Sequence, residues 1–205
     1  RMMQLDELLQ LILKEGKSMC ALHLKGSNQT KEKIDLLLFE LKKLHGIEKK
    51  IFIFDVKPGW AKYIKNKFPK LGAAPSVAHE YDIMRYNRYV NSTLIKVSEA
   101  LRLKKEKLYD WVWLDEWDKI DSNGKRKKLY TKEVFRKLRN AGYKIGLVTP
   151  ELHGTSPGLY GGEAHEDARS KKELMKRIHE IVRLCPDGVC TDYPKEVLNM
   201  WRNLS

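Results

Sequence analysis

Short apolar runs alternate along the chain with segments in which apolar residues recur at helical spacing. Each run is bounded by turn residues or charges and has the length of a buried strand. The runs cover residues 20–25, 51–56, 73–78, 111–115, 144–149 and 188–191. Because continuous apolar runs of this length are typical of strands covered on both faces, each one predicts a parallel strand.

The segments between the runs predict amphipathic helices, and a further helix precedes the first run. Ser170 and Glu173 form a capping-box pair, and Pro194 suits the first position of a last helix. The predicted apolar stripes are Leu5, Leu8, Leu9 and Ile12; Ile34, Leu37, Leu38, Leu41 and Leu44; Val134, Leu138 and Ala141; and Leu174, Ile178, Ile181 and Val182.

The alternation of strand and helix predicts an α/β fold with a parallel sheet, either doubly wound or part of a (β/α) barrel. In both architectures the chemistry lies at the carboxyl ends of the strands. Side chains alternate between the two faces of a strand, so one face of each run should line the interior of a barrel. The expected interior sets are Ala21, His23 and Lys25; Ile51, Ile53, Asp55 and Lys57; and Trp111, Trp113 and Asp115.

Composition narrows the classes of function. The 205 residues are 42% hydrophobic and 33% charged, which predicts a single globular domain over residues 1–205. No window reaches about eighteen uncharged apolar residues, and three cysteines are too few for a disulfide framework. We therefore expect a cytoplasmic protein with reduced thiols and no membrane span. The net charge of +13 favours an anionic partner: a phosphorylated small molecule, nucleic acid or an acidic membrane surface.

Polar residues follow the predicted strands at their carboxyl ends. His23 and Lys25 can together hold a phosphodiester, with the lysine as a point charge and the imidazole as metal ligand, acid or base. Asp115 can offer oxygen to a hard cation such as magnesium or calcium. Each of these residues also has a purely structural interpretation. His23 can be a hydrogen-bonded core histidine, and the acidic residues can belong to a solvated loop or cap a helix. The strand-end residues are His23 and Lys25; Asp55 and Lys57; His79, Glu80 and Asp82; Asp115, Glu116 and Asp118; Glu151 and His153; and Asp192.

Two long connections and the basic residues complete the pattern. Residues 116–130 and 152–170 are long enough to be functional loops or disordered surface segments, and Glu151 precedes the second as a candidate catalytic residue. The lysine clusters are spread over several predicted helices and one turn. Because a nucleic-acid interface needs its basic residues on one surface, nucleic-acid binding is the weaker hypothesis. Phosphate-binding glycine loops, zinc-type cysteine pairs and serine elbows are absent from the sequence.

The motifs "LHLKG", "AGYKIGLVTPE" and "DGVCTDYP" together resemble the glycerophosphodiester phosphodiesterase family, whose members are TIM-barrel hydrolases, and particularly its short bacterial proteins. "LHLKG" stands where the family has a third strand ending in Glu-x-Lys. "AGYKIGLVTPE" stands in place of the seventh strand, and "DGVCTDYP" closes the barrel before the last helix. The resemblance covers nearly all of the chain, and it implies a role in lipid metabolism.

The resemblance implies a divalent cation, Mg or Ca, and hydrolysis of a small anionic phosphodiester. Lys25 matches the family lysine, and His23 stands where the family has a metal-binding glutamate. We expect Lys25, His23 and Glu151 to be catalytic and His23 and Asp115 to bind metal. We expect substrate to contact Lys25, Lys57, Glu80 and Trp113.

The family's first two barrel units have no counterpart in this sequence. They carry the opening His-Arg-Gly strand, the Glu-x-Asp metal pair and the second catalytic histidine. The six predicted strands would then be strands three to eight of a barrel that is incomplete at its N-terminus. Because the sequence begins with Arg1, a missing N-terminal segment or a partner chain is expected to complete it. A non-catalytic module that binds a phosphorylated ligand is the main alternative.

Overall fold

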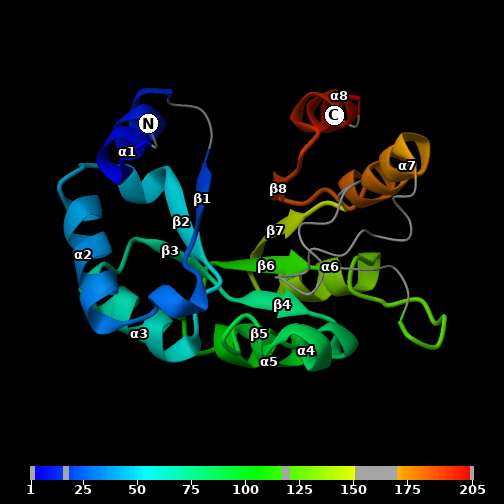
Figure 1. Cartoon of the computed structure of the whole chain (residues 1–205), viewed down its shortest axis with the longest axis horizontal. Coiled ribbons are helices and arrows are strands. Elements are labelled where there is room, and N and C mark those ends of the chain that lie inside the picture. Colours follow the sequence, from blue (N-terminus) through cyan, green and yellow to red (C-terminus); the bar gives the residue numbers. More distant parts are fainter. Residues whose placement is uncertain (1–2, 16–18, 117–120, 151–169, 204–205) are drawn as a thin grey trace.

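The computed structural model of the chain describes residues 3–15, 19–116, 121–150 and 170–203, and Figure 1 shows their arrangement. Each of the six predicted strand segments contains strand residues. The strands of the described part are β1 Cys20–His23, β2 Ile51–Phe54, β3 Gly72–Ala74, β4 Ser76–Ala78, β5 Leu94–Ile95, β6 Trp111–Asp115, β7 Lys144–Val148 and β8 Gly188–Cys190.

Helices follow nearly every strand, and their ends carry the expected caps. Ser170 Oγ accepts a hydrogen bond from the Glu173 amide, and Thr30 and Thr131 cap helices in the same way. None of the described helices is long and apolar enough to cross a bilayer. The helices are α1 Leu5–Glu15, α2 Lys31–Lys42, α3 Pro58–Lys67, α4 Glu80–Tyr86, α5 Val97–Lys104, α6 Lys132–Asn140, α7 Lys171–Val182 and α8 Pro194–Arg202, with short 3-10 turns η1 Gly26–Asn28 and η2 Ile47–Lys49.

The strands form two parallel sheets, in the orders β1-β2-β3 and β5-β4-β6-β7-β8. Pro75, which has no N–H to donate, separates β3 from β4, and its carbonyl accepts a hydrogen bond from the Trp113 amide of β6. The two sheets are thereby joined along β6 into one curved arc. The predicted parallel α/β fold is confirmed, but the described strands do not close into a barrel, and the predicted count of six units is not confirmed.

The two faces of the arc carry different apolar clusters. The helix-covered face holds the main core, in which Ile51, Ile53 and Val112 are fully buried. The inner face holds a smaller aromatic cluster that includes Phe52 and Trp113. The prediction that Ile51 and Ile53 face the interior was therefore wrong, because β2 turns its phenylalanines inward. The inward placement of Trp111 and Trp113 is confirmed.

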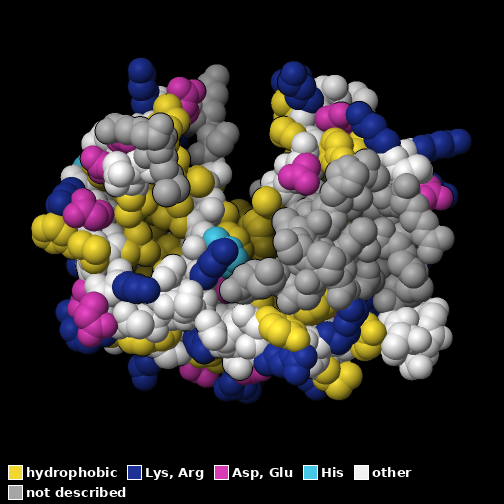
Figure 2. Space-filling view, viewed as in Figure 1, with side chains coloured by type: hydrophobic (Ala, Val, Ile, Leu, Met, Phe, Trp, Pro, Cys, Tyr) yellow, Lys and Arg dark blue, Asp and Glu magenta, His cyan; other side chains and the backbone are white. Residues whose placement is uncertain are grey.

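A hollow of about 610 Å³ lies between β1 and β8, which within the described residues are each paired on one side only. Figure 2 shows it as an apolar notch between the part bearing α1 and the part bearing α8. Its floor is the inner aromatic face, including Phe52, Trp111 and Trp113. The arc is thus open on this side.

Candidate functional site

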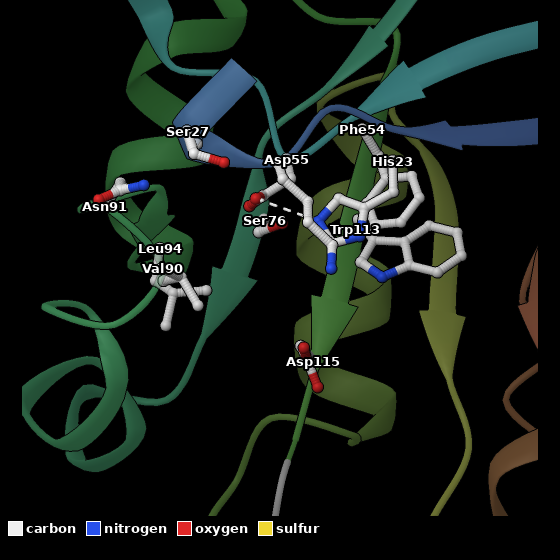
Figure 3. A pocket seen from close by; sticks show the side chains of 12 residues that line it. His23, Ser27, Phe54, Asp55, Ser76, Val90, Asn91, Leu94, Trp113 and Asp115 are labelled. Atoms are coloured by element: carbon white, nitrogen blue, oxygen red, sulfur yellow. Dashed lines mark hydrogen bonds and ion pairs between the residues drawn. The ribbon is translucent and has the colours of Figure 1, made fainter. Parts of the chain in front are cut away.

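A pocket of about 190 Å³, here called the rim pocket, lies where β1, β2 and β6 end, with Ser76 from the start of β4. The carboxyl ends of parallel strands meet at one edge of a sheet, so residues far apart in the sequence converge there. Figure 3 shows these side chains around the cavity. The polar lining consists of His23, Lys25, Ser27, Asp55, Ser76, Asn91 and Asp115.

His23 and Asp55 form the central contact of the rim pocket. His23 Nε2 lies 3.3 Å from Asp55 Oδ2, within hydrogen-bonding distance. The histidine side chain is 45% exposed, whereas that of Asp55 is only 7% exposed. The imidazole therefore faces solvent while its carboxylate partner lies behind it.

Asp55 reaches this position through an uncommon backbone conformation. Its φ is 67°, in the left-handed region that aspartate tolerates better than most residues. Regular alternation after Phe54 would turn residue 55 to the helix-covered face. The left-handed step instead places Asp55 in the pocket lining together with Phe54.

The buried side chain of Gln29 fixes the backbone around Asp55. Its Nε2 donates to the Asp55 carbonyl at 2.6 Å and to the Leu24 carbonyl at 3.0 Å. Its Oε1 accepts from the Lys57 amide at 3.0 Å. The Gln29 side chain thus connects the segment after β1 to the segment after β2. It provides hydrogen-bond partners for three backbone groups that lie beyond the ends of these strands.

An aromatic stack supports the histidine from below. The His23 and Phe54 rings lie 4.5 Å apart at 17°, and Phe54 stacks on Trp113 at 4.2 Å and 23°. Gly146 makes room for the indole, since a Cβ there would lie 2.7 Å from Trp113 Cε3. The stack restricts the plane of the imidazole, because tilting the ring would break its contact with Phe54.

The opposite wall of the pocket depends on Gly26. A Cβ on Gly26 would lie 2.6 Å from Asn91 Cβ and 2.9 Å from the Val90 carbonyl oxygen. The η1 turn and the segment after α4 therefore touch through bare backbone, which only glycine permits. This contact brings Ser27 and Asn91 to the same cavity as His23.

The structure brings four predicted site residues into the rim pocket: His23, Lys25, Trp113 and Asp115. The Lys57 side chain is not among the lining residues, and its backbone amide bonds Gln29. Glu80 lies on the surface at the start of α4, where its Oε1 pairs with Lys96 Nζ at 2.8 Å. Glu151 lies outside the described residues.

Two further strand-end acids, Glu116 and Asp82, form buried ion pairs. Glu116 Oε1 lies 2.5 Å from Arg177 Nη2, and burial raises the pKa of this carboxyl while the guanidinium opposes the rise. Asp82 binds Lys127 Nζ at 2.7 and 2.8 Å, and neither side chain is exposed. The Glu116 carboxylate also accepts hydrogen bonds from the Leu129 and Tyr130 amides, so both pairs contact the described segment 121–131 before α6 and serve the fold.

The described residues do not form a divalent-cation site by themselves. Nowhere among them do three or more histidine, cysteine or carboxylate side chains gather as metal ligands would. His23 and Asp115, the predicted ligands, line one pocket, but it is Asp55 that bonds His23. Figure 3 shows the Asp115 carboxylate well apart from that pair.

Sequence reasoning placed Asp55 at a strand end but gave it no role in the site. The sequence did contain a hint of this role. Asp55 directly follows an apolar run, and His23 stands at the end of the preceding predicted strand. Ser27, Ser76 and Asn91 carried no such signal, since they come from the η1 turn, the start of β4 and the segment after α4.

No protein-family model matches the chain, and no curated protein matches it. Solved structures do match its fold, and three of them are similar as follows. The first is a candidate glycerophosphodiester phosphodiesterase from Galdieria sulphuraria, with a TM-score of 0.58 and 16% identity over 97% of this chain and 63% of that one. The second is a glycerophosphoryl diester phosphodiesterase from Parabacteroides distasonis, with a TM-score of 0.55 and 16% identity over 100% of this chain and 56% of that one.

The third is a candidate glycerophosphoryl diester phosphodiesterase from Silicibacter pomeroyi, with a TM-score of 0.59 and 12% identity over 98% of this chain and 56% of that one. This chain therefore spans 56–63% of the length of the three proteins it matches. At these identities the likeness concerns the fold alone. The chain has a fold like that of the glycerophosphodiester phosphodiesterases.

Proposed function

We propose that the rim pocket binds a small anionic phosphodiester and hydrolyses it, as a phosphoric diester hydrolase of the glycerophosphodiester phosphodiesterase type. The observation that supports this best is the convergence of His23, Lys25 and Asp55 at the carboxyl ends of parallel strands. The fold in which they converge resembles that of phosphodiesterases.

Each group has a role that its chemistry permits. The Lys25 ammonium attracts a non-bridging phosphate oxygen, and the net charge of +13 steers the anion toward the protein. Water attacks phosphorus, and His23 takes one of its protons as the new P–O bond forms. The P–O bond to the leaving alcohol breaks, and a proton returns to the alkoxide. Glu151, Glu80 and Lys57 remain predicted contributors.

We also propose that the arc corresponds to strands three to eight of a (β/α) barrel. In this correspondence β3 and β4 together count as one barrel strand, and β5 is an additional strand outside the count. Two further parallel strands, from a longer form of this chain or from a partner polypeptide, would fill the hollow between β1 and β8. The support is physical: within the described part of the chain β1 and β8 each pair with one neighbouring strand only, and the floor of the hollow is aromatic. The intact and native masses of protein isolated from its source test this.

A divalent cation remains a prediction for this site, and no step above passes through one. The test is hydrolysis of an aryl phosphodiester with magnesium, with calcium and with a chelator. If the chelator abolishes hydrolysis, the reaction depends on a divalent cation. If hydrolysis continues in the presence of chelator, the predicted cation is not needed.

Lys25→Ala tests the anion site itself. The variant is expected to lose about 100-fold or more in kcat/KM while its unfolding midpoint stays unchanged, because Lys25 is exposed at the rim. Lys62→Ala is the matched control, since Lys62 is an exposed lysine on α3 outside the pocket lining. Equal activity in the two variants would contradict the role of Lys25.

A non-catalytic module for phosphorylated ligands is the second candidate, because an exposed lysine and a histidine that line one pocket can also hold a phosphate group without turnover. Such a module would bind a phosphate ester without turnover, with an affinity insensitive to chelator and lowered by Lys25→Ala. Nucleic-acid binding would instead fall steeply with salt and tolerate the loss of Lys25.

A further inference from the structure

We propose that Asp55 is a positioning residue that holds His23 in one tautomer, with a proton on Nε2 and the lone pair of Nδ1 available to the rim pocket. The inference rests on the proposed function, since it assigns the proton transfer of that reaction to one atom. The Asp55 carboxylate is one to which the sequence pattern assigned no role.

The first support is the contact itself. A carboxylate oxygen accepts hydrogen bonds, so the 3.3 Å approach of His23 Nε2 to Asp55 Oδ2 is a hydrogen bond only in the ring forms that carry a proton on Nε2. In the neutral ring Nδ1 is then unprotonated and can accept a proton. Among the described residues no hydrogen bond to Nδ1 is found, so this nitrogen can serve a ligand in the rim pocket.

The second support is that the ring has little freedom to adopt another arrangement. Its face stacks on Phe54, which rests on Trp113, a residue only 6% exposed. The stack sets the plane of the imidazole, and the Asp55 contact sets its rotation within that plane. Histidine orientation by a carboxylate behind the ring is an established way to prepare a general base.

The third support is the uncommon backbone that presents Asp55. A non-glycine residue with positive φ is uncommon and persists only where its surroundings enforce it. Here Gln29 holds the Asp55 carbonyl, and the Tyr109 hydroxyl donates to the next carbonyl, that of Val56, at 2.7 Å. The fold thus maintains a conformation whose visible effect is to bring a buried carboxylate to His23.

The proton balance of the step is simple. As water attacks phosphorus, one of its protons moves to His23 Nδ1 and the ring becomes an imidazolium. The Asp55 carboxylate stabilises this cation through the Nε2 proton, which it accepts in a hydrogen bond and does not remove. When the P–O bond to the alcohol breaks, the imidazolium returns the Nδ1 proton to the leaving oxygen.

The test is Asp55→Asn, which keeps the size of the side chain and tolerates the left-handed backbone. Asp115→Asn is the matched control, because Asp115 lines the same pocket and does not bond His23. The first readout is the tautomer of His23, from two-bond proton–nitrogen correlation spectra recorded well above the usual imidazole titration range. The His23→Gln variant assigns the signal among the six histidines.

The expected spectrum of the wild-type protein shows the Nε2-protonated tautomer, unchanged in Asp115→Asn and mixed with the Nδ1-protonated form in Asp55→Asn. The second readout is hydrolysis, in which Asp55→Asn is expected to lower kcat about 10- to 100-fold with KM within about twofold. An unchanged tautomer in Asp55→Asn overturns the proposal, whatever happens to kcat. If the wild-type protein shows no turnover, the proposed function fails, while the tautomer spectra still decide whether Asp55 positions His23.

Discussion

Gly146 provides the sharpest link between packing and the candidate site. It lies on β7 opposite Gly188 of β8, and both face the indoles of β6. A Cβ on residue 146 would lie 2.7 Å from Trp113 Cε3 and 2.9 Å from Cζ3. A Cβ on residue 188 would lie 3.6 Å from the nearest indole atom, which is ordinary contact. Replacing glycine by alanine should therefore lower the stability of the protein at position 146 but not at position 188.

The magnitude follows from these distances. In Gly146→Ala the ring of Trp113 must withdraw by about 0.7 Å to restore an ordinary contact near 3.4 Å, and Phe54 stacks on that ring. Overpacking of this kind costs about 1–3 kcal/mol. Replacing glycine by alanine within a strand returns about 0.5–1 kcal/mol by reducing the entropy of the unfolded chain. We expect Gly146→Ala to lower the free energy of unfolding by up to about 2.5 kcal/mol and Gly188→Ala to raise it by about 0.5–1 kcal/mol.

Urea unfolding followed by tryptophan fluorescence measures both variants. Near-ultraviolet circular dichroism of the folded proteins should change in Gly146→Ala and stay constant in Gly188→Ala, since only the first displaces Trp113. If Gly146→Ala is as stable as Gly188→Ala, the aromatic stack beneath His23 is not packed as described, and the argument that it orients the imidazole fails.

Two further predictions concern groups away from the pocket. Lys127→Met leaves the Asp82 carboxylate buried without its cation, so the free energy of unfolding should fall by about 3–5 kcal/mol, and the double variant with Asp82→Asn should recover part of it. A loss below about 1 kcal/mol in urea unfolding would contradict the pairing. Burial raises the pKa of the Cys20 thiol, so Cys20 should react with a disulfide reagent about tenfold more slowly at pH 8 than Cys185 and Cys190, and should accelerate as the pH rises. Removal of the slow phase in Cys20→Ser identifies it; a slow phase that persists there would refute the assignment.

The parallel α/β fold could be predicted because each buried strand is a short apolar run flanked by turn residues, a signal that local sequence carries. The division at Pro75 was less visible, since the apolar run continues through it. The two-residue strand β5 follows the polar segment 87–93 and has no run of its own. The inner face of β2 was predicted wrongly because Asp55 was used to set the alternation, and its positive φ reverses the phase at that residue.

Four residues of the pocket, His23, Lys25, Trp113 and Asp115, could be predicted because strand ends converge in any parallel sheet. The pairing of His23 with Asp55 could not, because it depends on a backbone conformation held by contacts from distant segments. Long-range hydrogen bonds of this kind leave no periodic trace in a sequence.

The measurement that tests the central claim most directly is phosphorus NMR of a glycerophosphodiester incubated with the wild-type chain. If the rim pocket is a phosphodiesterase site, the diester resonance is replaced by that of a phosphomonoester, and Lys25→Ala slows the conversion while Lys62→Ala does not. A diester resonance that persists and only broadens on adding protein would mean that the pocket binds phosphodiesters without hydrolysing them, and the hydrolase account would be wrong.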